Sequence, residues 1–346
     1  MTNLIKVTPS NRQFEVDDNV SVLEAALRAG LNINYSCASG GCGQCKARII
    51  SGEYQFHPSG DYKLTELEER QNTVLMCRTY AKSDLVIEAK EARSAADIPR
   101  QRIEARIAKL EKMGDDQMVV HLRTPRSQTL RFLAGQHVTI SLTGTVMKGM
   151  SSKNQSSIQV PPQDVAIASC PCNGMILQFH VERNEEDAFS NYFFREATVG
   201  KNVLIEGPFG EFALDEESRR PMVMVAEDSC FAPLKSLIEH AIALDLPQSI
   251  LLFWLVSADK THYLANYCRS WENAFDQFVY IPMTLNEDKD LSATYEDVVS
   301  EIVSRSPIES EIDLYLATPS KLANLLAQAF ESRGTPRSRI AITSVC

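Results

Sequence analysis

The spacing of hydrophobic and polar residues changes twice along this chain, which divides it into three parts. In the first part, apolar and polar residues alternate over short stretches that predict strands. Ser21-Val22-Leu23-Glu24 has the pattern of a capping box and predicts the start of an amphipathic helix that ends near Gly30. The expected strands are residues 3–8, 13–16, 46–50 and 85–88.

The second part, from Arg102 onward, consists of short apolar stretches separated by turn residues. Short strands at regular intervals predict a small antiparallel barrel, in which each strand pairs with its neighbours. The expected strands are residues 103–110, 118–122, 138–142, 165–168 and 176–181.

The third part, from Pro221 onward, contains continuous apolar runs, which are typical of strands buried on both faces. Between these runs, apolar residues recur at helical spacing in residues 234–242, 290–304 and 320–333. Alternation of strands and helices predicts a parallel α/β sheet. The expected strands are residues 222–225, 250–256, 278–281 and 312–316.

Together these patterns predict a multidomain protein with α+β, all-β and α/β parts, and 346 residues suit two or three domains. We expect the first domain to span residues 1–91, the barrel domain residues 102–216 and the α/β domain residues 217–346. Residues 92–101 are polar, rich in alanine and interrupted by a proline, which indicates an interdomain linker.

Composition narrows the function classes. A formal net charge of −10 argues against a nucleic-acid partner, because such a surface repels phosphates. No apolar run approaches the ~18–20 residues that span a bilayer, and the first residues lack the pattern of a secretory signal. Nine cysteines are an odd number, which makes a disulfide scaffold an unlikely interpretation and favours a reducing cytoplasm.

Four of the cysteines predict a metal cluster. Cys37, Cys42 and Cys45 have the spacing C-x4-C-x2-C, and Cys77 follows at a distance, which is the plant-type pattern for a [2Fe–2S] cluster. Glycines at 40, 41 and 43 let the loop bend sharply and point backbone N–H groups at the sulfurs. Free buried thiols would explain one cysteine, but not three at this spacing among glycines.

The cysteine motif and the order of elements resemble a plant-type ferredoxin, a β-grasp domain, over residues 1–90. The order of all three parts resembles the NAD(P)H-dependent reductase components of oxygenases and the CDP-6-deoxy-glucoseen reductase-like proteins of deoxysugar synthesis. This resemblance implies an antiparallel flavin-type β-barrel followed by a parallel α/β nucleotide-binding-like domain. It also implies that NAD(P)H reduces FAD, and that FAD passes single electrons to the cluster and on to an oxygenase component or similar acceptor.

The resemblance also implies positions for the two nucleotide cofactors. Gly207, Pro208 and Gly210 belong to a Gly-Pro-Phe-Gly segment that the flavin barrels share. Ser190 lies at the helix start that holds the FAD pyrophosphate in this family, and Ser229 lies in the loop on the nicotinamide side. We therefore expect these five residues to contact the cofactors, and we expect no separate catalytic side chain.

The flavin segments depart from the family pattern at these aligned positions. The family motif R-x-Y-S is replaced by Gln-Asp-Val-Ala at residues 163–166, so its arginine, tyrosine and serine are all absent. Glu186 and Asp187 precede Ser190, where a glycine would let a phosphate approach. Half of the helix-start motif therefore remains.

The nicotinamide segments depart as well. Where the family has G-G-T-G before Phe-Ala-Pro, residues 227–230 read Glu-Asp-Ser-Cys, so the glycines are lost. The later C-G-P-P motif is replaced by Ala-Thr-Pro-Ser at residues 317–320, and no terminal aromatic residue is present. Either the cofactors bind through altered contacts, or this module has lost flavin and nicotinamide chemistry.

Other cysteines carry weaker patterns. Cys170 and Cys172 form a C-x-C pair beside the flavin strand, which fits packing better than a metal or redox site but leaves both open. Cys230 replaces a glycine, and a small buried residue is the simpler interpretation. Cys268 and Cys346 carry no motif.

Two hypotheses of different class result. The first is an enzyme, a [2Fe–2S]/FAD reductase component that oxidises NAD(P)H, and the domain order and the Gly-Pro-Phe-Gly segment favour it. The second is a non-catalytic electron relay or assembly subunit, in which the last two domains form a docking platform. The lost flavin and nicotinamide motifs favour this second hypothesis.

Overall fold

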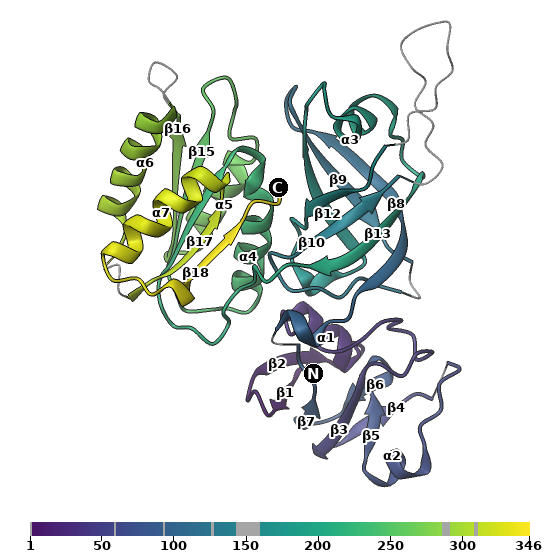
Figure 1. Cartoon of the computed structure of the whole chain (residues 1–346). Helices are drawn as coiled ribbons and strands as arrows, with labels where there is room; N and C mark the ends of the chain where they lie inside the picture. The colour runs from purple at the N-terminus through teal and green to yellow at the C-terminus, as the bar shows by residue number, and fades with distance from the viewer. Residues whose placement is uncertain are drawn as a thin grey trace, which may run out of the picture.

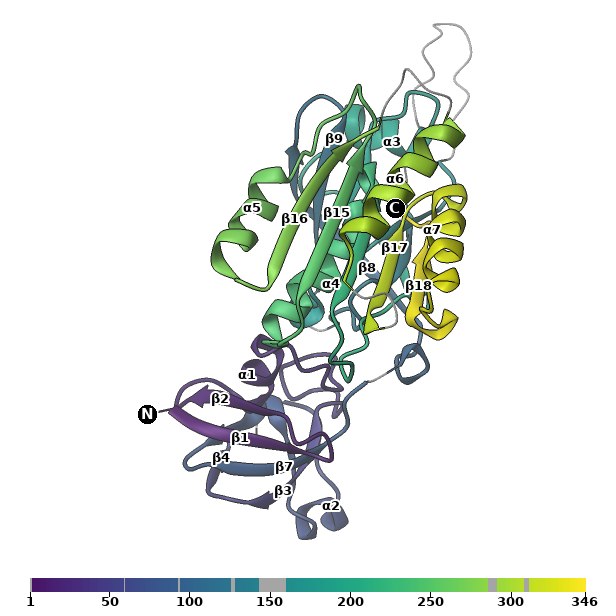
Figure 2. The same cartoon turned by 90° about the vertical axis from the view of Figure 1, so that its left-hand side faces the viewer.

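The computed structural model describes residues 2–58, 60–92, 94–125, 128–142, 160–285, 291–307 and 311–346. The chain forms three bodies in sequence order (Figure 1). The first lies below the other two, and the second and third lie side by side above it. Figure 2 shows the same arrangement after a quarter turn, with the first body beneath the parallel sheet of the third.

The first body is a mixed sheet with the strand order β2-β1-β7-β3-β5. β1 pairs with β2 in antiparallel register and with β7 in parallel register, which is the crossing typical of a β-grasp domain. Helix α1 packs on this sheet, and Ser21 caps it by accepting a hydrogen bond from Glu24 N–H. The elements are β1 (Thr2–Thr8), β2 (Gln13–Asp17), α1 (Val22–Arg28), β3 (Lys46–Ser51), β4 (Tyr54–Phe56), α2 (Glu66–Arg70), β5 (Thr73–Leu75), η1 (Met76–Arg78), β6 (Thr79–Ala81) and β7 (Leu85–Ala89).

The second body is a six-stranded antiparallel sheet with the order β11-β10-β13-β8-β9-β12. It curls into a nearly closed barrel, because Ala168 N–H beyond β11 donates to the carbonyl of Gln178 in β12. Its elements are η2 (Ala95–Asp97), β8 (Gln101–Lys112), β9 (Gln117–Arg123), β10 (His137–Ser141), β11 (Gln163–Ala166), η3 (Pro171–Asn173), β12 (Ile176–Glu182), α3 (Ala188–Asn191), η4 (Tyr192–Glu196) and β13 (Asn202–Phe209).

The third body is a parallel five-stranded sheet with the order β16-β15-β14-β17-β18. Helices α4 and α5 cover one face and α6 and α7 the other, so the central strand β14 is buried along its whole length (Figure 2). Its elements are β14 (Met222–Glu227), η5 (Asp228–Cys230), α4 (Phe231–Ala243), β15 (Ile250–Val256), α5 (Ala265–Ala274), β16 (Phe278–Thr284), α6 (Leu291–Arg305), β17 (Asp313–Ala317), α7 (Ser320–Ser332), η7 (Arg337–Arg339) and β18 (Ile340–Thr343).

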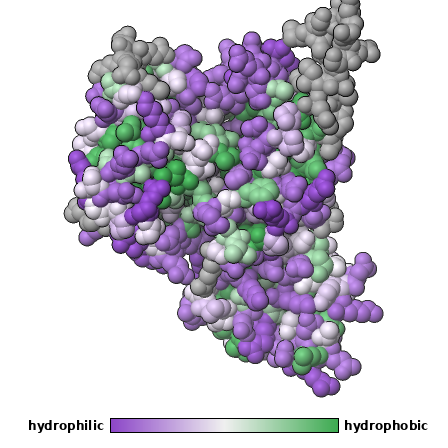
Figure 3. All heavy atoms as spheres, in the orientation of Figure 1, coloured by the Kyte–Doolittle hydropathy of each residue, from purple (hydrophilic) through white to green (hydrophobic). Residues whose placement is uncertain are grey.

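The predicted fold class is confirmed: a β-grasp-like α+β part, an antiparallel barrel and a parallel α/β sheet follow one another. The hydrophobic pattern predicted most of the strands but missed β13, which lies between β10 and β8 in the barrel, and the shorter strands β4, β5, β6 and β18. No helix in the described part of the chain is long and apolar enough to cross a membrane. Hydrophilic residues cover most of the face in Figure 3, with hydrophobic ones scattered among them.

Candidate metal centre and interdomain cleft

The four motif cysteines converge as two pairs. The Cys45 and Cys77 sulfurs lie 3.3 Å apart, although β3 begins after one residue and η1 contains the other. Cys37 and Cys42 lie at the two ends of the first loop turn, where the Cys42 sulfur accepts a hydrogen bond from Cys37 N–H at 3.5 Å. Cys37, Cys45 and Cys77 are buried, and Cys42 is half-buried at the edge of the domain. The tertiary fold therefore joins the four predicted ligands in two pairs.

Backbone N–H groups surround these sulfurs. Ser39 and Gly41 N–H groups point at the Cys37 sulfur at 3.4 and 3.3 Å, and Gln44 N–H points at the Cys42 sulfur at 3.5 Å. Hydrogen bonds of this kind stabilise thiolates and set the potential of an iron–sulfur cluster. Gly43 adopts a φ of +73°, and a Cβ there would lie 2.3 Å from the Tyr62 ring. The loop therefore requires a glycine at this position.

The same surroundings prepare the thiols to lose their protons. Burial raises the pKa of Cys37, but hydrogen bonds from Ser39, Cys42 and Gly41 outweigh it and bring the pKa to about 6. In the second pair, the hydrogen bond between the two sulfurs raises the pKa of Cys45 and lowers the pKa of Cys77. Each pair thus holds a thiol that ionises readily, and metal ligation requires the thiolate form.

These residues fit a [2Fe–2S] cluster. Two thiolates on each of two irons is the ligand set of that cluster, and the pairs Cys37/Cys42 and Cys45/Cys77 supply it. Among the described residues, no three His, Cys, Asp or Glu side chains converge as ligands of a single metal ion.

The cluster loop rests directly on the barrel. The Thr129 hydroxyl donates to the carbonyl of Ser36 at 2.9 Å, and Thr129 N–H donates to the same oxygen at 3.3 Å. Gly174 lies against Tyr35, and a Cβ on this glycine would come within 2.9 Å of the Tyr35 hydroxyl. The residue before the first cysteine ligand is thus anchored on the second domain.

The segment aligned with the family's flavin motif offers no cation. Gln163 and Asp164 are exposed at the start of β11, and Asp164 accepts a hydrogen bond from the Thr139 hydroxyl at 2.6 Å. Val165 and Ala166 are buried, and Ala166 N–H donates to the carbonyl of Cys346 at 3.4 Å. The inner end of this strand is therefore paired with the C-terminal segment.

The helix start at α3 is already capped by the chain itself. The Asp187 carboxylate accepts hydrogen bonds from Phe189 N–H at 3.2 Å and Ser190 N–H at 2.9 Å. The Ser190 hydroxyl donates to the carbonyl of Glu182 and accepts from Asn184 N–H, both at 2.8 Å. Both donors of the helix start and the Ser190 hydroxyl have partners within the barrel, so a phosphate would have to displace Asp187.

Side chains also occupy the loop on the nicotinamide side. Asp228 has a φ of +50°, and its carboxylate accepts hydrogen bonds from Ser257 and from Lys260, at 3.0 and 2.9 Å. Lys260 also forms an ion pair with Glu182 of the barrel, which ties the two domains together. Ser229, one of the expected contact residues, is buried in η5 beneath this pair.

The C-terminal segment lies between the barrel and the α/β domain, where the end of the chain is marked in Figure 1. Val345 packs against Ala166 and Ala168 of the barrel and Ala232 of α4. Cys346 forms a disulfide with Cys230, the residue that replaces a family glycine. The sequence predicted a small buried residue at Cys230, and this residue is buried. The sequence did not predict its disulfide with Cys346, because Cys346 belongs to no motif.

The remaining expected contact residues lie near a second opening. Gly207 and Pro208 are buried in β13, with a cis peptide bond between them. Gly210 lines a cleft of about 620 Å³ together with His137 and residues 338–345. Ser190 and Ser229 are not among the residues that line this cleft.

In this arrangement the residues do not fit a FAD pyrophosphate or a flavin ring. The described residues of β11 and α3 place carboxylates, and no arginine, at the aligned phosphate contacts. Val345 and the disulfide fill the space between Ala166 and Ala232. The signals that sequence reasoning missed are Asp187 as a helix cap and Cys346 as a partner of Cys230.

Comparisons with known proteins agree with the first domain and the overall architecture. Residues 5–82 match the family described as 2Fe-2S iron-sulfur cluster binding domain. The CDP-6-deoxy-L-threo-D-glycero-4-hexulose-3-dehydrase reductase of Yersinia pestis is 26% identical over 311 residues, which cover 90% of this chain and 88% of that protein. Reductase component 1 of terephthalate 1,2-dioxygenase from Comamonas is 29% identical over 281 residues, covering 81% and 78%.

A solved structure shares the fold along nearly the whole chain. The crystal structure of the Amycolatopsis cytochrome P450 reductase GcoB superposes with a TM-score of 0.56 at 22% identity. The superposition covers 98% of this chain and 97% of the other. The same three-part fold is therefore present in another protein.

Proposed function

Because this chain is a [2Fe–2S] ferredoxin domain fused to a ferredoxin reductase-like module, we propose that it transfers single electrons through its cluster to a protein acceptor. The observation that carries this proposal is the convergence of Cys37, Cys42, Cys45 and Cys77 as two thiol pairs within hydrogen-bonding N–H groups. A [2Fe–2S] cluster exchanges one electron at a time, and the half-buried Cys42 brings it close to the domain edge.

The relatives support one source for these electrons. They are reductases of a hexulose dehydrase and of a dioxygenase, and they match this chain over most of its length. In such a reductase component, electrons pass from NAD(P)H through FAD to the cluster and then to an oxygenase component or similar partner. We propose this electron-transfer role for the present chain and place it in the cytoplasm, where the ligand cysteines stay reduced.

A specific observation favours a second form of the same function. Val345, Cys346 and the Lys260–Asp228 ion pair occupy the cleft between the barrel and the α/β domain. In this form the cluster receives its electron from another protein, and the reductase-like module acts as a docking platform. Both forms share the cluster, and they differ in whether flavin is bound.

The visible spectrum of the purified full-length protein separates the two forms. Flavin bands near ~450 nm that bleach when NADH is added would support the reductase component. An iron–sulfur spectrum that NADH leaves unchanged, but that dithionite reduces, would support the flavin-free relay. Cys42→Ser removes a cluster ligand, so loss of the iron–sulfur bands is expected; bands identical to those of the wild type would overturn the shared proposal.

A further inference from the structure

A second cysteine pair lies outside the cluster domain and outside the residues that the family model matches. Cys170 and Cys172 form a disulfide across Pro171, at the short turn η3 that leaves the flavin-type strand. This turn packs between α1 of the ferredoxin domain and α4 of the α/β domain. The pair therefore lies where all three domains meet.

The two sulfurs have unlike surroundings. Cys170 is buried, with 7% of its surface exposed, whereas Cys172 is half-buried and reaches the surface. The Cys170 sulfur lies 3.8 Å from Nδ1 of His240, which is itself only 1% exposed. A reactive thiol pair commonly has one accessible sulfur and one protected sulfur beside a proton acceptor.

Glu216 orients this histidine. His240 Nε2 lies 2.8 Å from Glu216 Oε1, so the carboxylate holds the proton on Nε2 and leaves Nδ1 free to accept one from Cys170. Burial alone would raise the pKa of Glu216, but His240 and Arg12 hold it below its usual range. Cysteine, histidine and carboxylate thus stand in a line that positions the imidazole for proton transfer.

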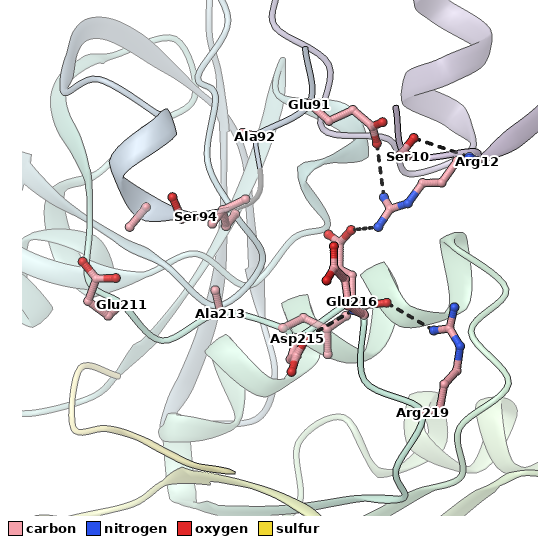
Figure 4. A pocket seen from close by; sticks show the side chains of 14 residues that line it. Ser10, Arg12, Glu91, Ala92, Ser94, Glu211, Ala213, Asp215, Glu216 and Arg219 are labelled. Carbon is pink, nitrogen blue, oxygen red and sulfur yellow. Dashed lines mark hydrogen bonds and ion pairs between the residues drawn. The ribbon is translucent and has the colours of Figure 1, made fainter. Parts of the chain in front are cut away.

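Other charges near the pair are balanced. Glu239 accepts a hydrogen bond from Cys170 N–H at 3.1 Å, and its other oxygen lies 2.6 Å from the buried ammonium of Lys235. Arg12 of the ferredoxin domain forms an ion pair with Glu216. Figure 4 shows Arg12 reaching between Glu91 and Glu216 at the cleft of about 800 Å³ that separates the domains. The proton carrier beside the Cys170 sulfur is therefore His240, whose other ring nitrogen is paired with Glu216.

We propose that Cys170 and Cys172 form a thiol–disulfide exchange site for soluble thiols, with His240 as the proton acceptor and Glu216 as its positioning residue. The site does not depend on whether the module binds flavin, because none of its members belongs to the flavin or nicotinamide segments. The protein would then hold a two-electron sulfur centre as well as the one-electron cluster. The cysteine pair belongs to the barrel, which also contacts the cluster loop through Thr129 and Ser36.

In the reducing direction, an incoming thiol releases its proton to solvent and attacks the accessible Cys172 sulfur as a thiolate. The Cys170 sulfur leaves as a thiolate and takes up a proton that solvent delivers through Nδ1 of His240. A second thiol then attacks the mixed disulfide at the incoming sulfur and releases Cys172. The sum is one protein disulfide and two thiols converted to one protein dithiol and one external disulfide. In the oxidising direction, the Cys172 thiolate attacks an external disulfide and releases one external thiol, which leaves Cys172 in a mixed disulfide. Nδ1 then accepts the Cys170 proton, and the Cys170 thiolate attacks Cys172 and displaces the second external thiol.

The first test is an equilibrium measured on the full-length, cluster-containing protein. The protein is equilibrated in mixtures of reduced and oxidised glutathione, and free thiols are then trapped with an alkylating reagent. After digestion, mass spectrometry measures how much of the peptide containing both cysteines is alkylated and how much is disulfide. The proposal expects a two-electron transition between dithiol and disulfide within the range of glutathione ratios used. A peptide that stays entirely dithiol or entirely disulfide at every ratio would overturn it.

The second test measures the rate at which oxidised glutathione oxidises the reduced pair. His240→Gln removes the proton acceptor, so the rate is expected to fall about tenfold or more. His121→Gln is the matched control, because His121 on β9 also lies beside a glutamate, Glu111, but its ring is not the one that faces the Cys170 sulfur. Its rate should match the wild type, and intact cluster absorbance verifies that each variant is folded. An unchanged rate in His240→Gln would contradict the proposed role of the imidazole.

Discussion

The carbonyl of Cys346 accepts a hydrogen bond from Ala166 N–H, which joins the C-terminal segment to the strand that aligns with the family's flavin motif. Val345 adds an apolar contact to the same strand, and Cys346 is bonded to Cys230 at the start of α4. One short segment thus spans the barrel and the α/β domain. Its removal is a direct way to learn whether the cleft beneath it still has an affinity for flavin.

Releasing this segment should increase flavin binding. The variant Val345→Gly with Cys346→Ser loses the apolar contact of the valine side chain, about 1–3 kcal/mol, together with the disulfide that holds the segment in place. We therefore expect FAD to bind about tenfold or more tightly, as measured by quenching of flavin fluorescence. Cys268→Ser, a buried free cysteine in α5, is the control and should leave binding unchanged. Equal FAD affinity in the released variant and the wild type would show that the segment does not cover a flavin site.

The disulfide between Cys230 and Cys346 should stabilise the protein only under oxidising conditions. It joins residues 116 positions apart, and the chain entropy of a loop of that length predicts a loss of roughly 4–5 kcal/mol when Cys346→Ser removes the bond. Thermal unfolding without reductant should therefore show a lower midpoint for the variant. In dithiothreitol the two midpoints should agree, and a difference that persists there would mean that the loss comes from packing of the side chain.

The cluster loop should tolerate a methyl group at Gly41 but not at Gly43. Gly43 has a φ of +73°, and an added Cβ would lie 2.3 Å from the Tyr62 ring, whereas a Cβ at Gly41 meets nothing within 4 Å. Gly43→Ala should cost about 1–3 kcal/mol and lower the iron content of the purified protein. Gly41→Ala should retain full iron content. Equal iron content in both variants would contradict the loop geometry.

The buried carboxyl of Glu227 should make stability fall as pH rises. Burial, which outweighs the hydrogen bond from Tyr295 and is aided by the nearby Asp228, raises the pKa of Glu227 from 4.5 to about 7. The folded protein therefore holds this proton between pH 4.5 and 7, where the unfolded chain releases it. The stabilisation is fully present below pH 4.5 and is lost as pH rises through 7, by about 2–3 kcal/mol.

Urea unfolding at pH 5 and pH 8 measures this effect. Glu227→Gln cannot ionise, so its free energy of unfolding should depend less on pH than that of the wild type by about that amount. Glu296→Gln, on helix α6, is the control for a general effect of removing a carboxylate. The same pH dependence in the wild type and in Glu227→Gln would place the titrating group elsewhere.

The sequence by itself determined the cluster, because its signal is local. Cys37, Cys42 and Cys45 lie within nine residues, and a loop that short with glycines has few ways to arrange three thiols. The change from alternating to continuous apolar runs also predicted the three kinds of sheet. Alternation indicates a strand buried on one face, and a continuous apolar run indicates a strand buried on both faces. The sequence alone also showed that residues 163–166 and 227–230 lack the flavin and nicotinamide motifs of the family.

Only the tertiary structure decided what replaced the lost contacts. Val345 contacts Ala166, although about half the chain separates the two residues in sequence. No sequence pattern in either segment predicts this contact. The line from Cys170 through His240 and Glu216 to Arg12 likewise joins four separate elements from three domains. Hydrophobic spacing determines which face of an element is buried, whereas the packing of domains against one another determines which buried side chains meet. The sequence therefore predicted the [2Fe–2S] cluster site. The fold decided that the C-terminal segment lies between the barrel and the α/β domain, and that Cys170 lies beside His240.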